Sequence, residues 1–133
     1  MLPMRERVSG PDHPRTLIAR FELARWTGEA GDAAAARDML AELLQARERV
    51  LGLDHSSTLY TRAELARWTG EAGDAAAARD MLAELLQARE RVLGLDHPST
   101  VSTHVEAARW TAEAGDAAAA RDMLAALLAK YRI

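Results

Sequence analysis

An internal repeat of 42 residues dominates this sequence. Residues 22–55 and 64–97 are identical, and Trp26, Trp68 and Trp110 follow one another at that spacing. Identical segments with the same neighbours are expected to adopt one conformation, so we predict a stack of repeats in which each unit contacts only the next. A single repeat domain is expected over residues 1–133, with units at about 12–53, 54–95 and 96–133 after the end of a truncated helix at 1–11.

The third copy departs from the first two, as is expected of a terminal unit with fewer neighbours. The third copy has Ala112 where the second copy has Gly70, and this difference predicts that alanine is tolerated at position 70. On that comparison Gly70→Ala is expected to be accepted and to stabilise by roughly 0.5 to 1 kcal/mol. The departures are Leu65 to Ala107, Gly70 to Ala112, Arg62 to His104 and Glu84 to Ala126.

Composition excludes several classes of protein. The 133 residues carry a formal net charge of -3 without a basic block, so nucleic acid is not an expected partner. There is no cysteine, which removes disulfides and thiolate metal sites. The start lacks the apolar core of a secretion signal, and no later segment reaches 18 apolar residues. These observations predict a cytoplasmic protein that does not enter a membrane.

Start and stop signals divide each unit into two helices. In the second copy, the segment from Asp54 to Thr58 is typical of a helix opening, where an Asp or Ser oxygen accepts a free amide proton. We expect a first helix over about 56–72. Gly73 then supplies a left-handed residue and Asp74 caps a second helix over 75–93, which Gly94 ends.

Apolar residues recur at helical spacing on both helices. The first helix carries two such stripes, which predicts packing on two sides, and a unit of this size cannot bury enough surface unless it is stacked. Trp68 and its counterparts are interpreted as core between units, with a ladder for stacking ligands as the alternative. The expected core positions are Leu59, Ala63, Ala66, Thr69, Leu65, Trp68 and Ala72 of the first helix, and Ala78, Met81, Leu82, Leu85, Leu86 and Val92 of the second.

The unit resembles the tetratricopeptide repeat. Leu65-Ala66 stands where that family has a large and a small residue, Gly73-Asp74 where it turns, and Ala78 and Leu82 where its second helix has a small and a bulky side chain. The longer unit resembles the 42-residue variety found in kinesin light chains. Arg62 and Thr69, however, occupy the usual tryptophan and tyrosine positions. The resemblance implies an all-α solenoid of tandem antiparallel helix pairs, a TPR-like superhelix.

The resemblance also implies a function, because first helices in that family line a concave groove that binds peptides or protein segments. Carried over by position, the groove holds Tyr60, Ala63, Arg67 and Glu71, flanked by Arg25, Glu29, Arg109 and Glu113. The candidates for binding a protein or peptide partner are Arg25, Tyr60, Arg67 and Arg109, of which the three arginines recur every 42 residues. The alternative is that Arg67 only pairs with Glu71, four residues on in the same helix.

Two other roles stay open. The chain is also compatible with a structural spacer or sensor arm of a larger multidomain regulator, and with a repeat array that has no specific ligand. Near-identity of the first two copies favours the spacer or sensor arm, because a groove for one irregular ligand usually needs different side chains in each unit.

Nothing in the sequence indicates catalysis, a cofactor or a metal site. Asp-His recurs once per unit, at 12–13, 54–55 and 96–97, which favours turns and helix caps over ligation of one ion. His104 is expected at the surface. There is no phosphate-binding glycine loop and no nucleophile beside a base, so the protein is not predicted to be an enzyme.

The ends of the stack predict weak head-to-tail self-association. The front carries the short segment Met4 to Val8, and the back carries Leu124, Leu127 and Leu128 on a helix where polar residues have become alanine. Two apolar ends of one stack form a heterologous contact, which extends as an open chain.

Overall fold

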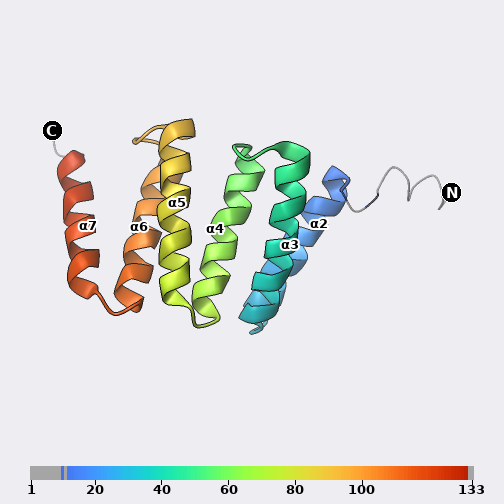
Figure 1. The fold of residues 1–133 in the computed structure, drawn as a ribbon, viewed down its shortest axis with the longest axis horizontal. Coiled ribbons are helices and arrows are strands. Elements are labelled where there is room, and N and C mark those ends of the chain that lie inside the picture. The colour runs from blue at the N-terminus through green and yellow to red at the C-terminus, as the bar shows by residue number, and fades with distance from the viewer. Residues whose placement is uncertain (1–9, 11, 132–133) are drawn as a thin grey trace. The chain divides into compact units, whose positions relative to one another are not determined.

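The computed structural model describes residues 10 and 12–131, and within this part of the chain all regular secondary structure is helical. The predicted segment Met4 to Val8 lies outside the described residues. Figure 1 labels the helices. They are α2 (Pro14–Glu29), α3 (Ala33–Leu51), α4 (Ser56–Glu71), α5 (Ala75–Leu93), α6 (Pro98–Glu113) and α7 (Ala117–Lys130).

The chain forms two compact units, Met1–Trp68 and Thr69–Ile133, and the boundary lies inside α4. In the first unit α2 packs on α3, and in the second α6 packs on both α5 and α7. Short turns join α2 to α3 and α6 to α7, so each of these pairs is antiparallel (Figure 1). The predicted all-α fold of tandem helix pairs is confirmed.

The turn between helices follows from two residues. Gly73 has a φ of +109°, a conformation that side-chain-bearing residues rarely adopt, and Asp74 Oδ1 then accepts the amide of Ala77 at 3.0 Å. Gly94, with a φ of +88°, ends α5. The second helix occupies the predicted range 75–93, and the first ends at Glu71, one residue before the expected end.

The first helices are capped by histidine, so the expected oxygen cap was wrong. Nδ1 of His13, His55 and His97 accepts the amide two residues further on, at 3.1, 3.0 and 3.0 Å respectively. Each imidazole nitrogen accepts a hydrogen bond and so satisfies one of the amides that a helix start leaves free. The recurring Asp-His pairs are therefore structural, as the sequence predicted.

Most of the expected core is buried. Leu59, Leu65, Ala66 and Thr69 of α4 are buried, and so are Ala78, Leu82 and Leu85 of α5. Two expectations were wrong. Val92 is exposed, and Trp26 is 58% exposed although Trp68 and Trp110 are only 5% and 4% exposed. In α2 the tryptophan face is not covered as it is in α4 and α6.

Each buried tryptophan packs against a glycine of the preceding first helix. A Cβ built on Gly28 would lie 2.6 to 2.7 Å from the indole of Trp68 in the first unit. In the second unit, a Cβ on Gly70 would lie 2.5 to 2.6 Å from the indole of Trp110. Each glycine thus leaves space for the indole, and we call the sites at Gly28 and Gly70 the tryptophan notches.

Buried arginine and threonine form a second link, which sequence patterns missed. Arg47 of α3 donates from Nη1 to Thr61 Oγ1 of α4 at 2.8 Å, and both side chains are buried. Arg89 of α5 repeats this bond with Thr103 of α6, also at 2.8 Å. Burial lowers the pKa of the Arg47 guanidinium, and the nearby charge of Arg20 lowers it further. A charged donor therefore lies in the core and joins α3 to α4 within the first unit, and α5 to α6 within the second.

We predict that Trp68→Ala lowers the free energy of unfolding by about 3 to 5 kcal/mol, the range for truncating a buried aromatic residue. The matched control is Trp26→Ala, which removes an exposed indole and is expected to cost less than about 1 kcal/mol. Chemical denaturation measures both. Equal losses in the two variants would contradict the placement of Trp68.

The expectation that Gly70→Ala is tolerated was wrong, because the indole of Trp110 occupies the space its Cβ needs. The third copy carries Ala112 at this position, where the residue is half-buried, whereas Gly70 is buried. We now predict that Gly70→Ala destabilises by about 1 to 3 kcal/mol, the usual cost of overpacking.

A double-mutant cycle separates this clash from a general effect on the helix. In a Trp110→Ala background the notch is empty, so Gly70→Ala should become neutral or stabilising by up to about 1 kcal/mol. The same loss in both backgrounds would show that the indole is not the cause.

Candidate protein-interaction surface

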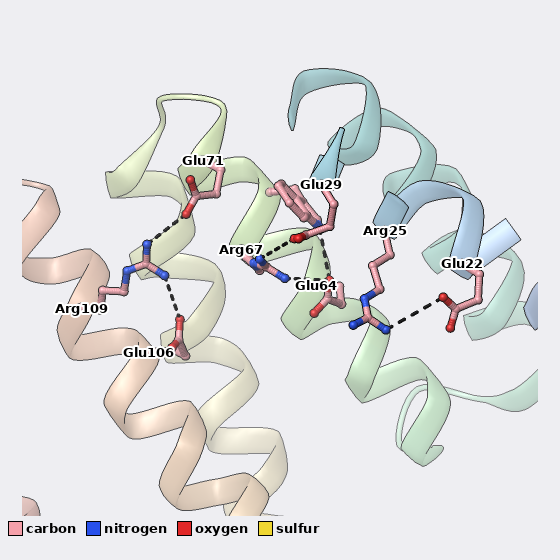
Figure 2. Close-up of polar contacts among 9 residues, drawn as sticks. Glu22, Arg25, Glu29, Glu64, Arg67, Glu71, Glu106 and Arg109 are labelled. Carbon is pink, nitrogen blue, oxygen red and sulfur yellow. Dashed lines mark hydrogen bonds and ion pairs between the residues drawn. The ribbon is translucent and has the colours of Figure 1, made fainter. Parts of the chain in front are cut away.

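Arg67, the central candidate residue, is held by carboxylates of two helices. In the first unit its Nη2 lies 2.8 Å from Oε1 of Glu29 on α2, and its Nη1 lies 4.0 Å from Oε2 of Glu64 on α4 (Figure 2). The side chains of Arg67 and Glu29 are each 40% exposed. Solvent screening therefore limits the strength of this pair, but the guanidinium stays accessible to a ligand.

Arg109 has the same arrangement in the second unit. Its Nη2 lies 3.0 Å from Oε1 of Glu71 on α4, and its Nη1 lies 3.8 Å from Oε2 of Glu106 on α6 (Figure 2). Each of these two arginines therefore joins a glutamate of the preceding first helix to a glutamate three residues earlier in its own helix.

Arg25 is held less firmly. The nearest carboxylate oxygen is Oε2 of Glu22, three residues earlier on α2, at 4.0 Å from Nη1. Its Cζ lies 5.2 Å from the centre of the Trp26 ring, which is itself exposed. Arg25 is thus the most weakly paired of the three candidate arginines.

The buried tryptophans orient the other two arginines. The Cζ of Arg67 lies 4.4 Å from the centre of the Trp68 ring, and that of Arg109 lies 4.5 Å from the centre of the Trp110 ring. A cation over an aromatic face is attracted by the negative face of the ring. Each guanidinium consequently lies between an indole face and carboxylate oxygens.

Tyr60, the fourth candidate, also contacts the preceding first helix. Its ring stacks on Phe21 of α2 with centres 5.2 Å apart and an angle of 25° between the planes. Phe21 is buried, whereas Tyr60 is exposed. In the first unit the structure therefore places Tyr60 and Arg67 on one helix and attaches both to α2.

The alternative of a simple pair within one helix named the wrong partner. Arg67 lies against Glu29, and Glu71 instead lies against Arg109. Sequence reasoning missed Glu29 as a partner although the signal was present. In a repeat array, any residue suited to pair four positions along a helix has an identical counterpart on the neighbouring helix.

Other chemistry is sparse in the part of the chain that the structure describes. No three His, Asp or Glu side chains there are grouped to hold a metal ion. His104 is half-buried rather than at the surface, with Nε2 3.5 Å from Glu90 Oε1. The described helices include none with the length and apolar character needed to span a membrane.

The family profile of the tetratricopeptide repeat matches residues 16–57 and 58–99, more than half of the sequence. The chain belongs to the tetratricopeptide repeat family. No curated protein sequence is similar enough to match it. Each matched segment starts inside a first helix and ends early in the next one, so the family's unit includes the tryptophan, the tight turn and the whole second helix.

Two crystal structures of nearly identical TPR-like repeats resemble this tetratricopeptide repeat chain. Both come from a kinesin light chain-like protein of Podosopora anserina, one of them from a point variant. Their TM-scores are 0.79 and 0.78, and each is 27% identical over 89% of this chain. The match covers 56% of the length of those structures. The long-repeat variety that the sequence suggested is therefore confirmed.

We predict a coupling of about 0.2 to 1 kcal/mol between Arg67 and Glu29, the usual value for an exposed ion pair. A double-mutant cycle of Arg67→Met and Glu29→Gln, followed by chemical denaturation, measures it. The coupling should decrease as salt is raised, because the pair is exposed. A larger coupling of Arg67 to Glu71 than to Glu29 would contradict the observed geometry.

Proposed function

We propose that this chain is a cytoplasmic protein-interaction scaffold that binds an acidic peptide or partner segment along its first helices. Tetratricopeptide repeats generally mediate protein-protein interaction, and the chain belongs to that family. The proposal adds where the partner binds. In the first unit the contacts would come from Arg67 and Tyr60 on α4 and from Arg25 on α2. In the second unit Arg109 on α6 is the equivalent candidate.

The observation that carries the proposal is the state of the two stacked arginines. Arg67 and Arg109 are oriented by indole rings yet remain 40% and 46% exposed. A guanidinium has five N–H donors, so it can bind a further carboxylate while keeping one to a glutamate. A pre-oriented donor loses little conformational entropy on binding, which favours recognition.

The glutamates that pair with the two arginines limit the affinity for an acidic ligand. Each stacked arginine already faces two carboxylates, so an acidic ligand has to compete with them and approaches some negative charge. Affinity is therefore expected to be modest and sensitive to salt. A partner that also offers an apolar or aromatic group would gain from Tyr60, which exposes one face beside Phe21.

A second role, as a structural spacer within a larger protein, is supported by the same ion pairs. The chain pairs Arg67 with Glu29 and Arg109 with Glu71 in the same manner. On this alternative the arginines serve only to join consecutive first helices.

Titration with a library of acidic peptides distinguishes the two roles. If the arginines bind the partner, Arg67→Gln should weaken binding about tenfold, since a hydrogen bond to a charged group contributes about 1.5 kcal/mol or more. Binding should also weaken as salt rises. Calorimetry or fluorescence anisotropy gives the dissociation constants.

Arg79→Gln is the matched control, because Arg79 is 41% exposed and, within residues 12–131, pairs only with the adjacent Asp80 on α5. It removes the same charge from a second helix and should leave binding nearly unchanged. An equal loss of peptide affinity in both variants would indicate a general charge effect. A library without any binder would favour the spacer.

A further inference from the structure

The exposed face of α2 is the same face that is buried in α4 and α6. Trp26 is 58% exposed, whereas Trp68 is 5% exposed, and Leu23 is exposed where its counterpart Leu65 is buried. Trp68 inserts at Gly28 of the helix before it. In the described part of the chain, Trp26 has no such notch. The face of α2 around Leu23 and Trp26 is here termed the leading face.

The α6 and α7 helices expose the complementary surface. Leu124 of α7 is 37% exposed, although its counterpart Leu82 of α5 is 3% exposed. Ala112 occupies the notch position on α6 and is only half-buried, whereas Gly28 and Gly70 are buried. We call this surface, which includes Ala112, Glu113 and Leu124, the trailing face.

Charges on the two faces match. Within the second unit, Glu71 on α4 binds Arg109 on α6, next to the notch at Gly70. The corresponding glutamate on the trailing face is Glu113, which is exposed, and the corresponding arginine on the leading face is Arg25. If α2 of one copy docked on α6 of another as α6 docks on α4, these opposite charges would meet. The same contact would cover the exposed side chains of Trp26 and Leu124.

One atom opposes this docking. At Gly70 an added Cβ would lie 2.5 to 2.6 Å from three atoms of the inserted indole, which is too close for any carbon pair. Ala112 carries that Cβ at the equivalent position. The indole of Trp26 from a second copy therefore cannot reach the depth that Trp68 and Trp110 reach.

We propose that the trailing face is a docking surface for the leading face of a second copy of this chain, and that residue 112 controls the contact. Alanine at this position keeps the contact weak, and glycine would open a notch for Trp26. Because the two faces differ, the contact is heterologous and would extend head to tail. The inference concerns the leading and trailing faces and does not depend on the proposed peptide-binding role.

Ala112→Gly tests the proposal directly. We expect its self-association constant to exceed that of the wild type by about tenfold or more, because relief of overpacking of this size changes an equilibrium by that factor. Sedimentation velocity over a hundredfold range of concentration measures it. Gly70 already occupies the equivalent position of α4, which stays helical to Glu71, so the variant is expected to fold. Circular dichroism checks this.

Ala112→Ser is the matched control. Serine also lowers helix propensity but keeps a Cβ, so this variant should associate no more than the wild type. If it assembles as strongly as Ala112→Gly, loosening of α6 is the cause and the proposal is wrong. A wild type that assembles as strongly as Ala112→Gly would equally overturn it.

Two further variants identify the docked surface. Trp26→Ala in the Ala112→Gly background should abolish assembly, since it removes the inserting side chain. Arg25→Glu in that background should weaken assembly, and adding Glu113→Arg should restore it. Assembly that is unchanged by both Trp26→Ala and the charge exchange would exclude this contact. A folded Ala112→Gly variant that stays monomeric over the whole concentration range would exclude it as well.

Discussion

The insertion of a tryptophan into a glycine notch is the contact on which the rest of this structure depends. Trp68 inserts at Gly28 in one unit and Trp110 at Gly70 in the other. Glycine within a helix costs roughly 0.5 to 1 kcal/mol relative to alanine. Burial of a whole indole offsets that cost, because a tryptophan removes a large apolar area from water. The glycine is thus a packing residue, and the helix tolerates it because its missing side chain makes room for the indole.

The arginine geometry follows from the buried indoles. Arg67 lies over the ring of Trp68 and reaches back to Glu29, and Arg109 lies over Trp110 and reaches back to Glu71. Without the indole, only the exposed glutamate side chains would hold each guanidinium in place. A surface that could bind an acidic partner is consequently a by-product of how consecutive first helices pack.

Buried polar bonds supply a second and different link between repeats. Arg47 to Thr61 and Arg89 to Thr103 join a second helix to the following first helix. A buried charge of this kind adds little net stability, but leaving it without its partner would be costly. Apolar contacts tolerate sliding, whereas a hydrogen bond at 2.8 Å does not. The two links together favour one alignment of neighbouring helices over others of similar buried area.

Local chemistry made much of this fold predictable from the sequence alone. Gly73, Asp74 and Gly94 act within a few residues of themselves, so the second helix was predicted over its observed range, and the 42-residue period with its apolar stripes identified the stacked helix pairs. Other properties were decided only by the tertiary structure. The sequence treats Trp26 like Trp68 and makes Gly70 look replaceable by alanine, yet the neighbouring helix decides burial and space. It also offers Arg67 both Glu29 and Glu71, which are equivalent residues of identical copies. Only packing brings one of them within 2.8 Å, because repeat identity specifies which residues are alike and not which of them are close.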